Sequence, residues 1–336
     1  MKAIELTVSP SPHIHCGARL TGISYNLLLA LLPAVAMGVY TYGFDALRVI
    51  CISISSAMVA EALIQKIFRK KVTIADGSAA VTGLLLALIL PANVPLYVVV
   101  MANFIGIIVG KQCFGGLGAN PLNPALVGWA VIRITKTWAG YLDFDLMLIN
   151  YDTGFILQYP LAVLKAKGTA PLSHFDLFAL FLGKQTGGIG AAAIICILAG
   201  GLYLVIRGII RWEIPLCFLI GVVVVSFIFW LGDKTIYANP FFHILTGNVM
   251  IGAFFLSTDH ASSPVNRWCM VGYGFGCGAM TVILRAWSTY PDGVIFACLL
   301  MGLFVPLLDK LKSKQVVPRP LEITALNSDK GEKTIS

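Results

Sequence analysis

The chain has 336 residues, of which 58% are hydrophobic and only 12% carry a charge. Soluble domains usually carry about 25% charged residues, so this composition excludes an ordinary water-soluble domain and indicates a polytopic membrane protein. The formal net charge of +8 requires no nucleic-acid partner, because Lys and Arg accumulate in the cytoplasmic loops of membrane proteins. We therefore expect lipid, and no nucleic acid, around most of the chain.

The first elements in chain order are a polar N-terminal segment and then a series of apolar runs. The segment reads "MKAIELTVSPSPHIHCGARL", which differs from a cleaved signal peptide, and we expect it to stay in the cytoplasm. The longer apolar runs are long enough to cross about 30 Å of hydrocarbon. Several others are short or carry Gly and Pro. We predict ten spans, at about 21–43, 45–66, 78–91, 95–111, 122–135, 190–208, 213–231, 243–258, 268–286 and 291–309.

The orientation of these spans follows from the positions of Lys and Arg. The segment "KIFRKK" at 66–71 is the strongest basic loop, so we place it in the cytoplasm. Alternating the spans from there puts both termini inside and leaves one loop outside that is too long to be a simple connector. The predicted organisation is a cytoplasmic segment (1–20), a first membrane half of five spans (21–135), an external loop (136–189), a second membrane half of five spans (190–310) and a cytoplasmic tail (311–336).

The two predicted halves resemble each other. The stretch "GLLLALILPANVP" starts at Gly83 and "GAFFLSTDHASSP" starts at Gly252, and both are Gly-led apolar runs that end at a proline. Five spans per half would make the halves run in opposite directions across the membrane, as in proteins with ion or solute pathways between inverted repeats. A chance similarity between two apolar stretches is the alternative.

The most specific stretch is "GKQCFGGLGANPLNPALVGWA", residues 110–130, which contains two Asn-Pro steps. Asn is a good helix N-cap and Pro fits the first helical turn, so one interpretation is a well-capped membrane half-helix. The other interpretation is a site for an anion or carbonyl, because a helix N-terminus next to a glycine loop offers free N–H groups. The sequence favours neither.

Four motifs carry a resemblance to a known family: "SPSPHIH", "DGSAAVTGLLLALILP", "GGLGANPLNPALVGWA" and "FFLSTDHASSPV". Together they resemble the RnfD protein of the Rnf electron-transport complex and its relative, the NqrB protein of the sodium-pumping NADH:quinone reductase. The resemblance implies an all-α fold of ten membrane helices in two inverted halves, similar to that of urea channels. It also implies a bacterial or archaeal cytoplasmic membrane component of a translocase that couples electron transfer between ferredoxin and NAD to ion movement. Its partners would be Rnf subunits of the A, B, C, E and G types.

The resemblance further implies FMN joined through its phosphate to a threonine hydroxyl. The family motif reads like Ser-Gly-Ala-Thr followed by Pro-Leu or Ala-Leu, whereas this chain has Lys-Gly-Thr-Ala-Pro-Leu at 167–172. Ala170 at the expected position cannot form the ester, and Thr169 lies one residue early. We expect Thr169 to hold the flavin, with Ser173 and Thr186 as weaker candidates. Either the modifying enzyme accepts Thr169 or this chain carries no covalent flavin.

The physical setting of Thr169 favours the same assignment. It lies in the long external loop, where a modifying enzyme can reach its hydroxyl, and Lys165 and Lys167 would favour a phosphate dianion. A second, non-covalent flavin between the halves is implied by the resemblance alone.

Ionisable residues within or beside the spans are candidates for ion handling. Glu61 is the carboxylate furthest inside a predicted span, and the alternative for it is a group near the cytoplasmic end that pairs with Lys66 or solvent. The other candidates flank the spans and are Asp76, Asp259, His260, Arg285 and Asp292. The sequence leaves open whether Na⁺ or H⁺ moves.

Several motifs carry no chemistry in our interpretation. "STDHASSP" is no hydrolase triad because it lacks a nucleophile elbow, and "GYGFGCGA" at 272–279 fits close helix packing. We expect no metal site, because His13 and His15 are too few ligands, and no iron–sulfur centre, because the eight cysteines contain no C-x-x-C. The rival functions are a passive channel or transporter for a small solute and a structural component of the same complex without flavin.

Overall fold

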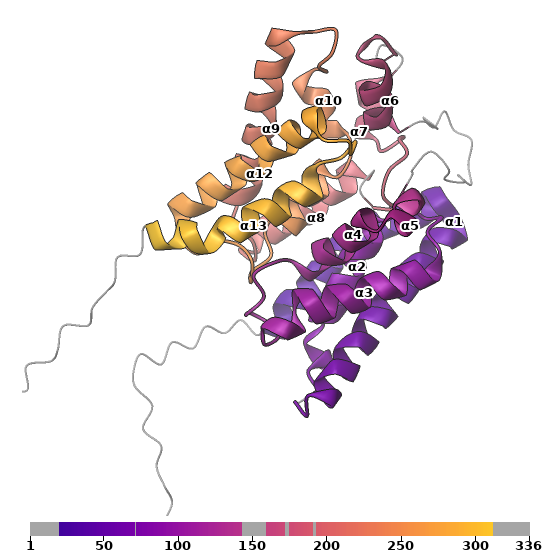
Figure 1. The fold of residues 1–336 in the computed structure, drawn as a ribbon, viewed down its shortest axis with the longest axis vertical. Helices are drawn as coiled ribbons and strands as arrows, with labels where there is room; N and C mark the ends of the chain where they lie inside the picture. Colours follow the sequence, from indigo (N-terminus) through magenta and orange to yellow (C-terminus); the bar gives the residue numbers. More distant parts are fainter. Residues whose placement is uncertain (1–19, 71, 143–158, 172–174, 191–192, 312–336) are drawn as a thin grey trace, which may run out of the picture.

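The computed structural model describes residues 20–70, 72–142, 159–171, 175–190 and 193–311. Within these ranges every regular element is a helix, and none is a β-strand. Figure 1 shows two groups of helices, one formed by α1 to α5 and the other by α8 to α13, which lie side by side. Of the predicted terminal segments 1–20 and 311–336, residues 1–19 and 312–336 lie outside the described residues.

The first group begins with a helical hairpin. α1 (Leu20–Ile67) has 48 residues, but Gly43 has φ 65° and ψ −141°, so the helix turns there. A straight helix of this length would extend about 72 Å, more than twice the hydrocarbon thickness, whereas each arm matches one crossing. A residue with a Cβ would be strained in this left-handed region, which explains why glycine stands at the turn. The predicted boundary between the first two spans is confirmed.

α2 and α3 pack against this hairpin, and α4 packs against α3 and α2. α2 and α4 are only 12 and 11 residues long, too short for a full crossing as straight helices, and α3 is longer at 15. Asn123 caps α4 by accepting a hydrogen bond from the amide of Ala125 at 3.0 Å, with Pro124 in the first turn. The elements are η1 (Ile74–Asp76), α2 (Ser78–Ile89), α3 (Leu96–Gly110), η2 (Gln112–Phe114), α4 (Pro124–Ile134), α5 (Lys136–Ala139) and η3 (Gly140–Leu142).

Short helices connect the two groups. α6 (Pro160–Lys167) and α7 (Leu177–Phe181) occupy the described part of the predicted external loop. Residues 143–158 and 172–174 of that loop lie outside the described residues. In Figure 1, α6 lies near the ends of α9 and α10, far from the tip where the second arm of α1 ends.

The second group has an element order like that of the first. α8 (Ile194–Ile206) and α9 (Glu213–Gly232) precede a broken helical stretch, and α12 (Arg267–Trp287) and α13 (Val294–Leu311) follow it. The predicted span at 243–258 is not one helix but three pieces, α10 (Pro240–Leu245), α11 (Val249–Ile251) and the π-helical η6 (Gly252–Leu256). Gly247 breaks the stretch because its φ is 69°.

The two groups contact each other through equivalent helices, namely α1 with α8 and α4 with α13. Glycines allow close approach: a Cβ on Gly200 of α8 would lie 2.0 Å from the carbonyl oxygen of Ala30 in α1. Within the second group, a Cβ on Gly278 of α12 would lie 2.1 Å from the carbonyl oxygen of Phe218 in α9. The prediction that "GYGFGCGA" serves close helix packing is therefore confirmed.

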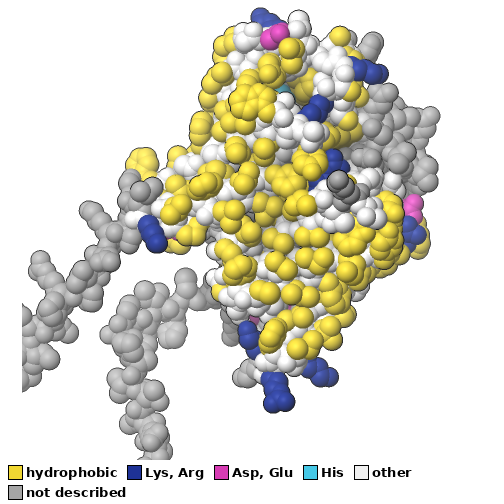
Figure 2. Space-filling view, in the orientation of Figure 1, with side chains coloured by type: hydrophobic (Ala, Val, Ile, Leu, Met, Phe, Trp, Pro, Cys, Tyr) yellow, Lys and Arg dark blue, Asp and Glu magenta, His cyan; other side chains and the backbone are white. Residues whose placement is uncertain are grey.

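The surface and the helix lengths define a multi-pass membrane protein. In the part of the chain that the structure describes, four helices are long and apolar enough to cross a membrane, namely Thr21–Ile67, Leu96–Phe114, Glu213–Gly232 and Arg267–Trp287. Figure 2 shows a broad hydrophobic surface, with Lys and Arg side chains gathered at the lower tip where α1 ends. We call this end the basic end, after Lys66, Arg69 and Lys70, and the opposite end the α6 end.

Candidate functional sites: two cavities beside buried cations

A buried ion pair lies near the basic end of the first group. The Nζ of Lys111, just after α3, lies 2.7 Å from the Oε1 of Glu61 on α1, and the two side chains are 2% and 1% exposed. Lys111 also donates to the Oγ of Ser78 at 2.7 Å, at the first residue of α2. This contact network joins α1, α2 and the end of α3.

The partner of Glu61 differs from the one expected. Lys66 is exposed and lies five residues further along α1, about 140° around the helix, so it faces away from Glu61. Gln65 and Gln112 instead donate to the Oε1 of Glu61 at 3.1 and 3.2 Å. The Oε2 of Glu61 has no hydrogen-bond partner among the described residues. Glu61 is thus a buried charge, and the alternative of a carboxylate paired with Lys66 or solvent is wrong.

A cavity of about 800 Å³ lies beside Lys111, and its lining comes from both groups of helices. We call it the inter-half cavity. Most of its wall is apolar, from α1, α2 and η6. The polar lining residues include Ser78, Lys111, Asn120, Asn123, Asp259 and His260.

The two Asn-Pro steps form one corner of this cavity. The side chain of Asn123 caps α4 and also donates to the carbonyl of Leu256 at 3.4 Å, which ties the two groups together. Asn120 donates to the carbonyl of Leu122 at 3.1 Å, but its buried Oδ1 has no partner among the described residues. Asn123 confirms the interpretation as a capped helix. The interpretation as an anion or carbonyl site stays a prediction, because the unused atom of Asn120 is an acceptor and would bind a donor group.

Asp259 and His260 complete the cavity wall but do not form an acid–base pair. His260 places Nε2 3.0 Å from the carbonyl oxygen of Ile209, and Asp259 accepts from the hydroxyl of Ser262 at 3.1 Å. Burial raises the pKa of Asp259, and the hydrogen bond from Ser262, the nearby His260 and the amide of Asn120 oppose that shift. Asp259 and His260 therefore have separate hydrogen-bond partners.

A second buried ion pair lies near the α6 end of the second group. The Nη2 of Arg285, in the last turn of α12, lies 3.1 Å from the Oδ1 of Asp292, and the side chains are 3% and 6% exposed. Arg285 also donates to the carbonyls of His243 and Thr246 at 2.8 and 2.9 Å. The other carboxylate oxygen of Asp292 accepts from the backbone and side-chain amides of Asn248, at 2.8 and 2.7 Å.

A cavity of about 580 Å³ lies beside this pair, and we call it the Arg285 cavity. Its described lining carries two cationic side chains, Lys165 and Arg285, and no carboxylate. Lys165 of α6 donates to the carbonyls of Ser288 and Tyr290, the latter at 3.1 Å. Burial lowers the pKa of Lys165. The cavity therefore favours a ligand that is negatively charged or rich in acceptor atoms.

Thr169 lies next to the segment that forms one wall of the Arg285 cavity. Its hydroxyl is 2.7 Å from the carbonyl oxygen of Thr235 and 3.0 Å from that of Lys234, and its amide donates to the same Thr235 carbonyl at 3.1 Å. The next two residues along the chain, Ile236 and Tyr237, line the cavity. Thr169 is half-buried, at the turn that follows α6.

The weaker attachment candidates differ in accessibility. Thr186 is 1% exposed, so an enzyme cannot reach its hydroxyl in this conformation. Ser173 lies outside the described residues, as do His13 and His15. Lys167 is exposed near Thr169, and Ala170 lies on the exposed side of the same turn. Among the described residues, no group of three His, Cys, Asp or Glu side chains is placed to hold a metal ion.

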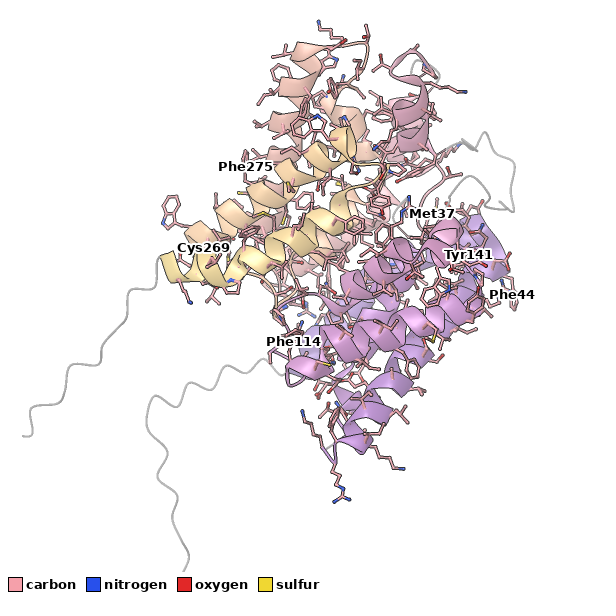
Figure 3. All side chains as sticks on the ribbon, viewed as in Figure 1. Met37, Phe44, Phe114, Tyr141, Cys269 and Phe275 are labelled. Carbon is pink, nitrogen blue, oxygen red and sulfur yellow. The ribbon has the colours of Figure 1, made fainter. Side chains whose placement is uncertain are left out.

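The sequence identified most of the buried charged side chains, but it did not predict the ion pairs that they form. Arg285 and Asp292 were separate candidates, and Lys111 was counted only as a loop charge. A usable signal existed for Arg285 and Asp292, since they lie seven residues apart around the short connection between α12 and α13. Figure 3 shows Phe44 and Tyr141 at one end of the first group and Phe114 toward the other, so Lys111, three residues before Phe114, belongs to the opposite end from Tyr141.

The fold and the two cavities define a class, namely multi-pass helical membrane proteins with two groups of helices. One cavity lies between the two groups, and the other lies between α6 and the second group. Residues 7–317 match the NQR2, RnfD, RnfE family, and the chain belongs to this family.

Individual relatives match over nearly the whole chain. The D subunit of the Na⁺-translocating ferredoxin:NAD⁺ oxidoreductase complex of Acetobacterium woodii is 38% identical over 317 residues, covering 94% of this chain and 96% of the relative. The D subunit of the proton-translocating ferredoxin:NAD⁺ oxidoreductase complex of Clostridium ljungdahlii is 36% identical, covering 90% and 93%. The D subunit of the ion-translocating oxidoreductase complex of Cronobacter sakazakii is 32% identical, covering 90% and 96%.

Proposed function

We propose that this chain is the D-type membrane subunit of an ion-translocating ferredoxin:NAD⁺ oxidoreductase complex in a bacterial or archaeal cytoplasmic membrane. The full-length similarity to relatives with that function carries the proposal. Its partners are the other Rnf subunits, of the A, B, C, E and G types, which bring the ferredoxin and NAD chemistry. The relatives from Acetobacterium woodii and Clostridium ljungdahlii belong to Na⁺- and proton-translocating complexes respectively, so similarity alone does not choose the ion.

The chain carries FMN through a phosphoester to Thr169 in this proposal. The residues fit the group in two respects: the hydroxyl sits on a half-buried turn that an enzyme can approach, and the Arg285 cavity begins one residue beyond its Thr235 contact. An ester oxygen has no proton to donate, so modification gives up the hydroxyl's hydrogen bond to the 234–235 backbone. The amide of Thr169 still donates to the carbonyl of Thr235, so the turn stays anchored beside the cavity.

The chain's own residues would bind and shield the flavin, which supplies electron transfer when bound. Thr169 fixes its phosphate end, and the exposed Lys167 offers a cation to the phosphate. The apolar wall of the Arg285 cavity, which includes Leu161, Leu164 and Phe229, excludes water from a ring held there. Electrons come from partner subunits and leave to partner subunits.

The inter-half cavity would hold a second, non-covalent flavin. The unpartnered acceptor of Asn120, the ammonium of Lys111 and the broad apolar wall suit a flat ligand with polar edges. A ring at this position would contact both groups of helices.

Two inverted halves of five spans are part of the same proposal. Contacts at the basic end include Asn123 with Leu256, and contacts at the α6 end include Arg133 stacked 4.7 Å over the ring of Tyr290. The first group begins at the basic end, where α1 starts. The second group begins at the α6 end, because the amide of Gly190, shortly before α8, donates to the carbonyl of Leu88 near the far end of α2. The halves then run in opposite directions, as expected for an ion path between repeats and for a fold similar to urea channels.

The attachment is tested by in-gel fluorescence of the denatured full chain, expressed with its complex. We expect a band that fluoresces under ultraviolet light, disappears in Thr169→Ala and persists in Thr169→Ser, because serine retains the hydroxyl. Thr235→Ala is the matched control and should keep the fluorescent band. It removes a neighbouring threonine hydroxyl, which donates to Asp233 at 2.6 Å and is not the proposed attachment point.

A dark band from the parent chain would contradict the attachment. The chain would then be the flavin-less structural component or, if it also purifies without partners and conducts a small solute in vesicles, the passive channel. A band that persists in Thr169→Ala and disappears in Ser173→Ala would move the attachment to the weaker candidate.

A further inference from the structure

We propose that Arg285 is the electrostatic partner of the flavin ring, and that it raises the reduction potential of that flavin by stabilising the reduced ring. This inference rests on the proposed attachment at Thr169. It assigns the Arg285 cavity as the place where the ring docks.

Arg285 is held firmly in the wall of this cavity. The side chain is 3% exposed and forms part of the wall together with His243 and Lys165. Three acceptors fix it there, the carbonyls of His243 and Thr246 and the carboxylate of Asp292. A cation held in this way moves little when the charge beside it changes, and such a fixed position is the condition for electrostatic preorganisation.

Arg285 also has a donor that the protein leaves unused. Its buried Nε has no hydrogen-bond partner among the described residues. An unsatisfied buried donor is costly, and a native structure usually pairs it with a ligand, an ion or water. The ring of a flavin carries carbonyl oxygens and ring nitrogens that accept hydrogen bonds.

The charge that faces the cavity is positive. Asp292 is absent from the described lining, and the backbone and side chain of Asn248 already engage its second oxygen. A ligand in the cavity therefore meets the guanidinium before it meets the carboxylate. Two electrons and one proton taken up by the ring leave it with one negative charge, and a nearby cation in a partly dry site stabilises that charge.

The first half contains a matched pair with a different setting. Lys111 follows α3 as Arg285 ends α12, and each cation is bonded to a buried carboxylate. The cavity beside Lys111 also contains Asp259, whereas the Arg285 cavity has no described carboxylate. The two sites therefore differ in charge, and the positive bias belongs to the Arg285 cavity.

The test is an optical redox titration of the purified full chain, after in-gel fluorescence has shown that the flavin is attached. Arg285→Gln removes the charge and leaves Asp292 unpaired. Arg285→Met with Asp292→Asn removes both charges and keeps an oxygen acceptor for Asn248, so it preserves folding better. In both variants we expect the preference for the reduced over the oxidised ring to fall at least tenfold, which is about 30 mV for a two-electron couple.

Two further variants give the experiment its controls. Arg285→Lys retains the charge and is expected to keep the potential closer to that of the parent than Arg285→Gln does. Arg267→Met with Glu213→Gln removes an ion pair that lines neither cavity and is expected to leave the potential of the attached flavin unchanged. A fluorescent band whose potential is the same in all variants overturns the role of Arg285 while leaving the attachment intact. A dark parent band overturns the attachment and this inference together.

Discussion

At the scale of single residues, buried charges are the most unusual feature of this chain. Glu61, Lys111, Arg285 and Asp292 are each no more than 6% exposed. Ionisable groups at such positions are expensive, and they persist in membrane proteins where they pair with each other or serve a site. Both pairs border a cavity, which links the charge pattern to the proposed flavin sites.

The pair in the first half gives a prediction about stability. Lys111→Met leaves the carboxylate of Glu61 buried without its cation, and removing one partner of a buried pair typically costs about 3–5 kcal/mol. We expect a clear fall in the unfolding midpoint of the detergent-solubilised chain, measured by tryptophan fluorescence.

The double variant is the control for this prediction. Lys111→Met with Glu61→Gln removes both charges and keeps acceptor oxygen for Gln65 and Gln112, so most of the lost stability should return. If the single and double variants lowered the unfolding midpoint equally, the unpaired carboxylate of Glu61 would not be the cause of the lost stability.

Some of these residues were predictable from the sequence and others were not. Asn123 was recognisable as a cap because the Asn-Pro signal is local, and Glu61 was recognisable because it interrupts an apolar run. The partner of Glu61 was not, since Lys111 lies 50 residues away and only the packing of α3 against α1 brings it near. Pairing across a fold depends on helix registers that hydropathy does not contain.

At the scale of elements, glycine faces determine how closely the helices pack. On α12, a Cβ at Gly274 would lie 2.7 Å from the carbonyl oxygen of Ile214, and a Cβ at Gly278 would lie 2.1 Å from that of Phe218. The first half has a similar arrangement, with a Cβ at Gly128 of α4 placed 2.6 Å from the carbonyl oxygen of Ala102 in α3. Small residues at such contacts let backbones approach where the hydrophobic effect does not drive helices together.

The contact between α9 and α12 can be tested on one helix. Gly278→Ala places a methyl group where α9 must shift, and overpacking of this kind costs about 1–3 kcal/mol. Gly272→Ala is the matched control, because a Cβ there meets no atom within 4 Å and helical propensity should stabilise it by about 0.5–1 kcal/mol. The opposite signs are measurable as shifts in thermal stability in detergent, and a stable Gly278→Ala protein would refute the packing.

The elements also show what hydropathy predicts well. The hairpin turn at Gly43, the short α2 and the long α9 and α12 lie where apolar runs and Gly or Pro placed them. The break inside 240–256 was not predicted, although the Thr-Gly-Asn step at 246–248 interrupts the apolar run at that point. The local step supplies the positive φ of Gly247, but the bonds of Asp292 to Asn248 come from the connection before α13 and were not predictable from the run itself.

At the scale of the whole molecule, the function depends on which end faces the cytoplasm. The basic end carries Lys66, Arg69 and Lys70, whereas Thr169 and the Arg285 cavity lie at the α6 end. The distribution of Lys and Arg in short loops favours a cytoplasmic basic end. The proposed flavin would then lie on the outer side.

Thiol labelling tests this orientation. Lys167→Cys places an exposed thiol near Thr169, and Lys70→Cys places one at the basic end. A membrane-impermeant maleimide should label the first variant in sealed cells and the second only in inside-out vesicles, each measured against the parent chain with its native cysteines. The reverse pattern would place the α6 end in the cytoplasm and contradict the topology.

The most direct measurement of the central claim is mass spectrometry of the tryptic peptide between Lys167 and Lys184, which contains both Thr169 and Ser173. We predict that its mass is increased by FMN less one water, and that fragmentation places the addition on Thr169. An unmodified peptide from the assembled complex would contradict the claim that this chain carries a covalent flavin.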